Sequence, residues 1–104
     1  MNVFNIVNAA DQQFSAFFDN RRVTLRLRYN KVLDRWMFDL SIDDAPVLNG
    51  RRIVNDRDLL RGFGFGIGAL VAFSPGNAEP TRNALPGGKV KLYQLSPAEM
   101  ATAA

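Results

Sequence analysis

The sequence predicts an all-β fold: a single small barrel or sandwich of about six to seven short antiparallel strands, with a short C-terminal helical or disordered tail. Two observations lead to this prediction. Apolar and polar side chains alternate along several segments, and turn residues separate these segments at intervals of about eight to twelve residues. A chain of 104 residues corresponds to one domain, which we expect to span residues 1–95 and to leave residues 96–104 as the tail.

The chain begins with two short strand candidates. Residues 2–7 form an apolar run, and residues 13–18 alternate Gln and Ser with Phe and Ala. Asp19-Asn20 then provides a turn signal. The first segment has no basic region before it and is short, so we expect no signal peptide.

The strongest alternation lies in residues 23–29 and 36–42, which flank a hairpin-type loop at residues 30–34. One face of each segment carries bulky apolar side chains, including Tyr29 and Trp36, and the other face carries polar or charged ones. We therefore expect two antiparallel neighbours whose apolar faces share one core.

The outer face of this strand pair would bring Arg26 and Arg28 close to Asp39 and Asp43. Cross-strand ion pairing on a solvated surface is one interpretation of these charges. The other interpretation is that the two arginines fix the register of a contact with a partner protein. Spacing alone leaves both interpretations open.

A third strand is expected after an Asp-Asp-Ala-Pro turn at residues 43–46. It covers residues 47–54 and is interrupted by Asn49-Gly50, which predicts either a tight turn or a bulge. Residues 55–61 predict one helical turn, with Asn55 or Asp56 as its cap.

The rest of the chain predicts two more strands and a helix start. Residues 68–73 form a candidate core strand, and residues 89–95 form the last strand. The intervening residues 74–88 are rich in Pro, Gly and Asn, so we expect a loop. Ser96 and Pro97 are typical of a helix cap and a first helical position.

Glycine occupies every second position from Gly62 to Gly68 and alternates with Phe63, Phe65 and Ile67. This is not a dinucleotide-binding fingerprint, because Ile67 stands where the third glycine is needed. Two interpretations remain. The segment is either a glycine-bent strand whose phenylalanines reach the core, or a loop that docks its phenylalanines into a partner protein.

Composition narrows the possible chemistry. The chain contains no Cys and no His, which excludes thiol nucleophiles, imidazole metal sites and Ser-His-Asp triads. The carboxylates of Asp43, Asp44, Asp56 and Asp58 do not follow a calcium-loop pattern, so turn capping and arginine pairing are their expected roles. We expect no enzyme, no cofactor and no metal site. The uncharged apolar stretch of about a dozen residues is too short for a membrane span, which needs about 20.

A net charge of +3, with arginine as the main cation, permits an anionic partner. The alternative function is therefore a small nucleic-acid-binding β-barrel. Nucleic-acid binding also needs exposed aromatic rings, whereas Tyr29 and Trp36 lie on apolar strand faces. The candidate basic track for nucleic-acid binding consists of Arg21, Arg22, Arg26, Arg28, Arg51 and Arg52.

A hydrolase is the third class of protein considered, and it would need a cleft that contains carboxylates of perturbed pKa.

Several short motifs follow one another in a fixed order between residues 22 and 95. They are Tyr29-Asn30, Asp34-Arg35-Trp36, Asp39-Leu40, Pro46-Val47-Leu48, Gly50-Arg51-Arg52-Ile53-Val54, Asp58-Leu59-Leu60, Leu85, Gly87-Gly88 and the strand from Val90 to Leu95. This order resembles the baseplate plug proteins of contractile-tailed bacteriophages, which are small β-rich proteins. The sequence departs from the family pattern at Ala45, where glycine is more usual, and residues 62–68 lie outside the pattern.

The resemblance implies a structural virion protein of the tail baseplate, made in the bacterial host cytoplasm, without catalysis or cofactor. It implies contacts with tail hub, tail tube or sheath-initiator proteins, and several copies in a threefold or sixfold ring. No membrane partner is implied, and nucleic acid is not expected. Aromatic anchors and arginines dominate such contacts. The candidate partner-binding residues are Phe63, Phe65, Ile67, Arg26, Arg28, Arg51 and Arg52.

Overall fold

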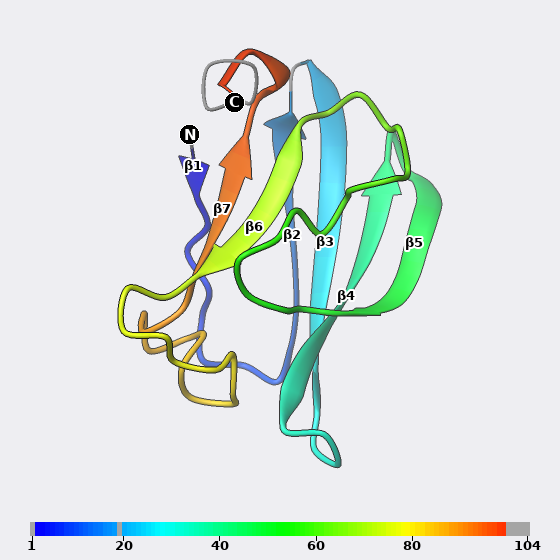
Figure 1. The fold of residues 1–104 in the computed structure, drawn as a ribbon. Coiled ribbons are helices and arrows are strands. Elements are labelled where there is room, and N and C mark those ends of the chain that lie inside the picture. Colours follow the sequence, from blue (N-terminus) through cyan, green and yellow to red (C-terminus); the bar gives the residue numbers. More distant parts are fainter. Residues whose placement is uncertain (1, 19, 100–104) are drawn as a thin grey trace.

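The computed structural model describes residues 2–18 and 20–99, and these residues form seven strands in two antiparallel sheets (Figure 1). One sheet has four strands in the order β2-β3-β4-β5, and the other has three in the order β1-β7-β6. The strands are β1 (Asn2–Val3), β2 (Asp11–Phe18), β3 (Arg21–Asn30), β4 (Arg35–Ile42), β5 (Ala45–Arg52), β6 (Ala69–Phe73) and β7 (Lys91–Leu95).

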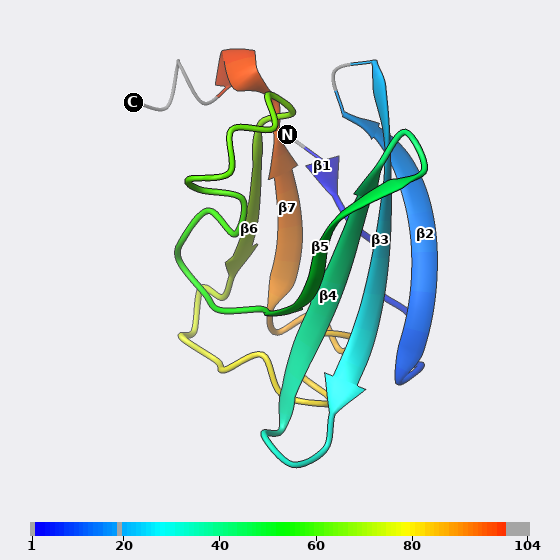
Figure 2. The same ribbon diagram turned by 90° about the vertical axis from the view of Figure 1, so that its right-hand side faces the viewer.

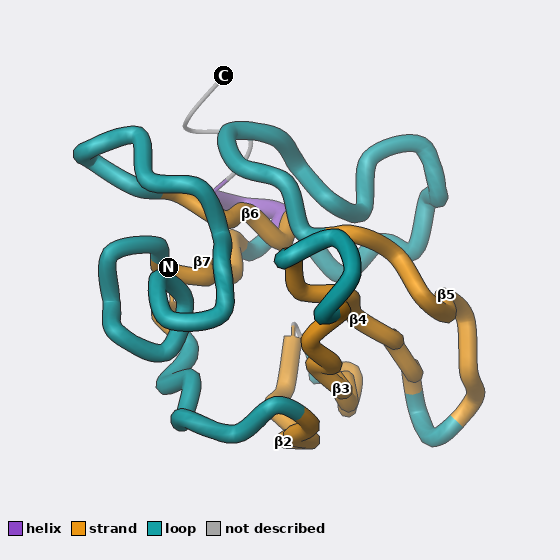
Figure 3. The backbone as a smooth tube through the Cα atoms, turned by 90° about the horizontal axis from the view of Figure 1, so that it is seen from below, coloured by secondary structure: helices purple, strands orange, loops and turns teal. Residues whose placement is uncertain are grey.

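The two sheets face each other as the layers of a sandwich (Figure 2). Seen end-on, β6 and β7 lie in one layer, and β2, β3, β4 and β5 lie in the other (Figure 3). The all-β prediction is therefore confirmed. Of the two predicted architectures, the described residues adopt the sandwich and do not close into a barrel.

Consecutive hairpins build the four-stranded sheet. Strands β3 and β4 pair in register from Val23 opposite Ile42 to Asn30 opposite Arg35, as the alternation predicted. Asp43 and Asp44 both have positive φ, which forms a tight two-residue turn into β5. The predicted four-residue turn is thus shorter, because Ala45 and Pro46 already pair with β4.

Asn49-Gly50 forms a bulge rather than a turn. The pairing between β4 and β5 shifts register between Phe38 and Leu40, so two residues of β5 lie opposite Asp39. Gly50 has a φ of 63° and donates its N–H to the Asp39 carboxylate at 2.7 Å. The bulge turns the end of β5, so that Arg51 pairs with Phe38.

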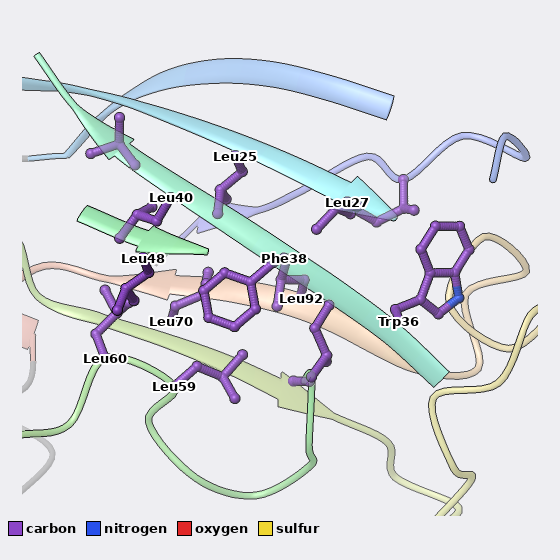
Figure 4. Close-up of a cluster of buried hydrophobic side chains, with 14 of the residues drawn as sticks. Leu25, Leu27, Trp36, Phe38, Leu40, Leu48, Leu59, Leu60, Leu70 and Leu92 are labelled. Atoms are coloured by element: carbon purple, nitrogen blue, oxygen red, sulfur yellow. The ribbon is translucent and has the colours of Figure 1, made fainter. Parts of the chain in front are cut away.

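The core lies between the sheets and is centred on β3 and β4. Phe38 lies between Leu70 and Leu92 of the opposite sheet, and Leu59 and Leu60 approach from the connection that follows β5 (Figure 4). Trp36 is fully buried, and its indole N–H donates to the Thr81 carbonyl at 3.0 Å. The predicted inward direction of Trp36 is therefore confirmed.

Residues 53–68 connect β5 at the edge of one sheet to β6 at the edge of the other (Figure 2). The predicted helical turn at residues 55–61 is wrong. These residues form turns, with isolated bridges from Asn55 to Ala72 and from Asp58 to Val71. Asp58 explains the difference, because its carboxylate accepts N–H bonds from Leu60 and Leu70 and so ties the connection to β6.

At the two ends of the chain, the strand predictions are partly confirmed. The first strand is shorter than predicted, since it spans only Asn2–Val3. Ser96 caps a short helical turn as predicted: its hydroxyl accepts the Glu99 N–H, and the Glu99 carboxylate accepts the Ser96 N–H. Asp19 of the predicted turn and residues 100–104 of the predicted tail lie outside the described residues. No helix among the described residues has the length and apolar character needed to cross a membrane.

The glycines of the connection can be tested with a matched pair of substitutions. A Cβ on Gly68 would lie 1.9 Å from the carbonyl oxygen of Leu95, whereas one on Gly66 meets nothing within 4 Å. Both glycines have positive φ, so Gly66→Ala should cost about 1–2 kcal/mol of unfolding free energy. Gly68→Ala should cost about 1–3 kcal/mol more, because β7 must move. Urea unfolding of both variants measures this difference, and equal costs would contradict the close approach of Gly68 to β7.

Candidate protein-docking surface

A groove of about 780 Å³ lies between the end of β5 and the connection to β6. Its floor is apolar and includes side chains of the core, and its walls carry arginines and one phenylalanine. We call this hollow the arginine groove. It is lined by Phe38, Arg51, Arg52, Val54, Asp56, Arg57, Asp58, Leu59, Arg61, Gly62 and Phe63.

Nine of the ten arginines fall into two groups, and the tenth, Arg82, lies over the rings of Tyr29 and Trp36. Five of them form ion pairs with carboxylates and lie on or next to the β2-β3-β4 surface: Arg21, Arg22, Arg26, Arg28 and Arg35. The four arginines of the groove are exposed, and their guanidinium groups make no ion pair or hydrogen bond within residues 2–18 and 20–99. Unpaired guanidinium groups are therefore concentrated at one place in the described structure.

An aromatic stack stands at the rim of the groove. The ring of Phe63 stacks on Phe65 with centroids 5.5 Å apart and an angle of 4° between the ring planes. The Arg51 guanidinium lies over the Phe63 ring, 5.1 Å from its centroid. The structure thus brings together three residues that the sequence singled out.

The period-two glycines do not form a strand. Gly62, Gly64, Gly66 and Gly68 all have positive φ, so the segment is a series of turns and not a ribbon with one apolar side. Its three large apolar residues lie in different environments. Phe63 is 39% exposed, Phe65 is half-buried against the core, and Ile67 is fully buried.

The connection is held by buried anchors at intervals. Ile53, Leu59, Leu60 and Ile67 all belong to the core. The Asp58 carboxylate adds a polar anchor through the amide groups of Leu60 and Leu70. Most of the residues between these anchors are exposed, so the groove arises from the way the connection folds over the core.

Arg26 and Arg28 lie on the outer surface of the four-stranded sheet, apart from the groove. Arg28 pairs with Asp39 at 2.8 Å, as one interpretation of the alternation expected. Arg26 pairs with Asp11 of β2 at 2.7 Å and not with Asp39, its direct cross-strand neighbour. Both guanidinium groups therefore already have carboxylate partners within the chain.

Arg52 belongs to the groove together with Arg51, whereas Arg57 and Arg61 were not identified from the sequence. A signal was present: these two cations lie four residues apart and flank the Asp58-Leu59-Leu60 motif. The alternation of apolar and polar residues that locates strands could not place Arg57 and Arg61, because the connection at residues 53–68 has no regular period.

Apolar side chains also remain exposed on the outer face of the three-stranded sheet. Val71, Phe73, Tyr93 and Leu95 line a shallow hollow of about 340 Å³, and Phe73 is 44% exposed. Its lining lacks charged side chains. This face therefore differs in chemistry from the arginine groove.

The carboxylates take structural roles. Asp43 accepts hydrogen bonds from the Arg21 side chain and the Arg22 N–H, and the Arg21 bond holds the pKa of this carboxyl below its ordinary value. Asp34 accepts the Tyr29 hydroxyl, which lowers the pKa of Asp34 and raises that of Tyr29. No group of three or more acidic side chains within the described part of the chain is arranged to hold a metal ion.

Comparison with known proteins identifies the family. The family model described as "Cyanophage baseplate Pam3 plug gp18" matches residues 1–97. No curated protein matches the chain. Because the model covers most of the 104 residues, the chain belongs to this family of phage baseplate plugs, and its role in the phage baseplate is structural. The resemblance drawn from the motif order is thereby confirmed.

The pairing of Arg26 can be tested through the pKa of Asp11. Two hydrogen bonds from Arg26 hold this pKa below its ordinary value. A lowered folded-state pKa contributes stability above the unfolded-state pKa, and this contribution is lost as the pH falls through the folded-state pKa. Arg26→Gln should raise the pKa of Asp11 in an NMR titration of the side-chain carboxyl carbon. Arg51→Gln should leave it unchanged, and an equal response to both substitutions would contradict the pairing.

Proposed function

We propose that this plug works by protein–protein contact, without catalysis, in the inner baseplate of a contractile phage tail. In this proposal it is an adaptor that contacts the tail hub, tail tube or sheath-initiator proteins and keeps the baseplate locked until contraction. It is made in the host cytoplasm and is then incorporated into the virion tail.

The observation that carries the proposal is the arginine groove with its aromatic rim. Interface energy in proteins is concentrated in a few aromatic and arginine side chains near an apolar centre. Arg51, Arg52 and Phe63 provide such side chains around the apolar floor formed by Phe38 and Leu59. Phe65 supports Phe63 from below by stacking, and Ile67 anchors the segment in the core.

Several copies of the plug in a threefold or sixfold ring would each present this groove in the same way. A ring uses heterologous contacts, in which one surface of a subunit meets a different surface of its neighbour. The groove and the apolar face around Phe73 are two different surfaces of one chain, which suits contacts with two different neighbours.

Nucleic-acid binding is less well supported. Trp36 is fully buried and bonded to Thr81, so its ring is not available for base stacking. The Arg82 guanidinium lies over the rings of Tyr29 and Trp36, 5.8 and 5.5 Å from their centroids. Sub-micromolar DNA binding that falls steeply with salt would favour this alternative over the proposal.

A substitution at the groove rim tests the proposal against a matched control. Phe63→Ala removes a ring that is 39% exposed, so it should change the unfolding free energy by only about 1 kcal/mol. Phe17→Ala removes a ring that is 73% exposed on β2 and is not part of the groove lining. Each variant is supplied to phage that lack the gene, and plug content per virion is measured by mass spectrometry.

The expected result is loss of Phe63→Ala plug from virions, whereas Phe17→Ala plug is incorporated normally. Thermal melts of the isolated variants should both remain cooperative. Normal incorporation of Phe63→Ala would exclude the groove as the assembly contact. Loss of its cooperative melt would show that Phe63 is needed for folding and not for docking.

A further inference from the structure

The charge pattern of the arginine groove indicates the chemistry of what it binds. Arg51, Arg52, Arg57 and Arg61 surround one hollow, and their guanidinium groups lack a carboxylate partner among the described residues. Like charges gathered around one hollow repel each other, and this repulsion is relieved when an anion binds between them. Five of the other six arginines are paired with aspartate or glutamate, and the sixth, Arg82, lies over the rings of Tyr29 and Trp36.

The two aspartates of the lining do not neutralise this charge. Asp58 uses one carboxylate oxygen to accept the amide N–H groups of Leu60 and Leu70, so it serves the fold of the connection. Asp56 is exposed and makes no ion pair within the described structure. Four arginines and two aspartates leave a net lining charge of +2.

The floor adds a second requirement. The Phe63 ring, 39% exposed, and the half-buried Val54 give the groove apolar surface beside the guanidinium groups, above the buried side chains of Phe38 and Leu59. A free phosphate or another small anion would leave this surface uncovered. An occupant that fits both features carries several carboxylates together with at least one apolar side chain.

We infer that the arginine groove binds an acidic segment of a partner protein, in which Asp or Glu residues alternate with apolar ones. This inference rests on the proposed function, because it names the chemistry of the docking partner. Each carboxylate of the segment accepts paired hydrogen bonds from a guanidinium group, and the apolar side chains cover the floor. A nucleic-acid strand fits less well, because the Phe63 ring is already stacked on Phe65 and lies under the Arg51 guanidinium, so it is not free to stack on a base.

Fluorescence anisotropy with a labelled peptide tests the inference on the full chain. The probe is an eight-residue peptide that alternates glutamate with leucine, and the control replaces each glutamate with glutamine. A labelled oligothymidylate of equal charge is the third probe. The first protein variant is Arg57→Gln/Arg61→Gln in the groove. The matched control is Arg22→Gln/Arg26→Gln, which removes the same charge from the ion-paired surface.

The glutamate peptide should bind, and the glutamine peptide should bind at least about tenfold more weakly. The groove variant should weaken binding of the glutamate peptide by about tenfold or more, and the control variant by less than about threefold. The inference is overturned if the glutamate peptide does not bind at millimolar concentration, if both variants weaken binding equally, or if the oligothymidylate binds more tightly.

These outcomes are separate from those of the incorporation experiment. If the peptide fails to bind while Phe63→Ala plug is still lost from virions, the acidic-segment inference is wrong and the docking role stands. If the peptide binds as expected while Phe63→Ala plug is incorporated normally, the groove chemistry stands and the docking role is wrong.

Discussion

The rest of the structure depends on the buried face of the central β3–β4 hairpin. Its apolar side chains cannot remain exposed to water, and the opposite sheet of β1, β7 and β6 is too small to cover them all. The connection from β5 to β6 covers the rest of this apolar face with its own buried side chains. One of them is Leu59, which lies on the same side of the core as Phe38 (Figure 4). An irregular segment thereby becomes part of the core, although it contains no regular secondary structure beyond isolated bridges.

The same constraint produces the arginine groove. Because the connection sends Ile53, Leu59 and Ile67 inward, most of the residues between them are left at the surface. Arg57 and Phe63 therefore stand outside the core but next to its apolar edge. The result is a surface where charge and apolar area lie side by side, and such a surface suits specific contact with another protein better than a uniformly charged or uniformly apolar one.

Strand periodicity accounts for what could be predicted. The alternation of β3 and β4 specified their pairing and the burial of Trp36, because a face buried against a core fixes the register of a sheet. The connection has no period that could be used in this way. Its glycines alternate with apolar residues as in a strand, yet Gly62, Gly64, Gly66 and Gly68 adopt positive φ. The contact of Arg51 with Phe63 joins a strand end to a turn across the sandwich edge, and no local pattern encodes such a contact. Candidate residue types were therefore predictable, whereas their grouping into one site required the fold.

Cryo-electron microscopy of the assembled baseplate tests the central claim most directly, namely that the plug docks through the arginine groove. The map should show the groove covered by a neighbouring protein, with Phe63 buried and carboxylates of that neighbour within hydrogen-bond distance of Arg57 or Arg61. A groove that faces solvent in the assembled baseplate, with neighbours bound instead over the ion-paired outer surface around Arg26 and Arg28, would contradict the claim.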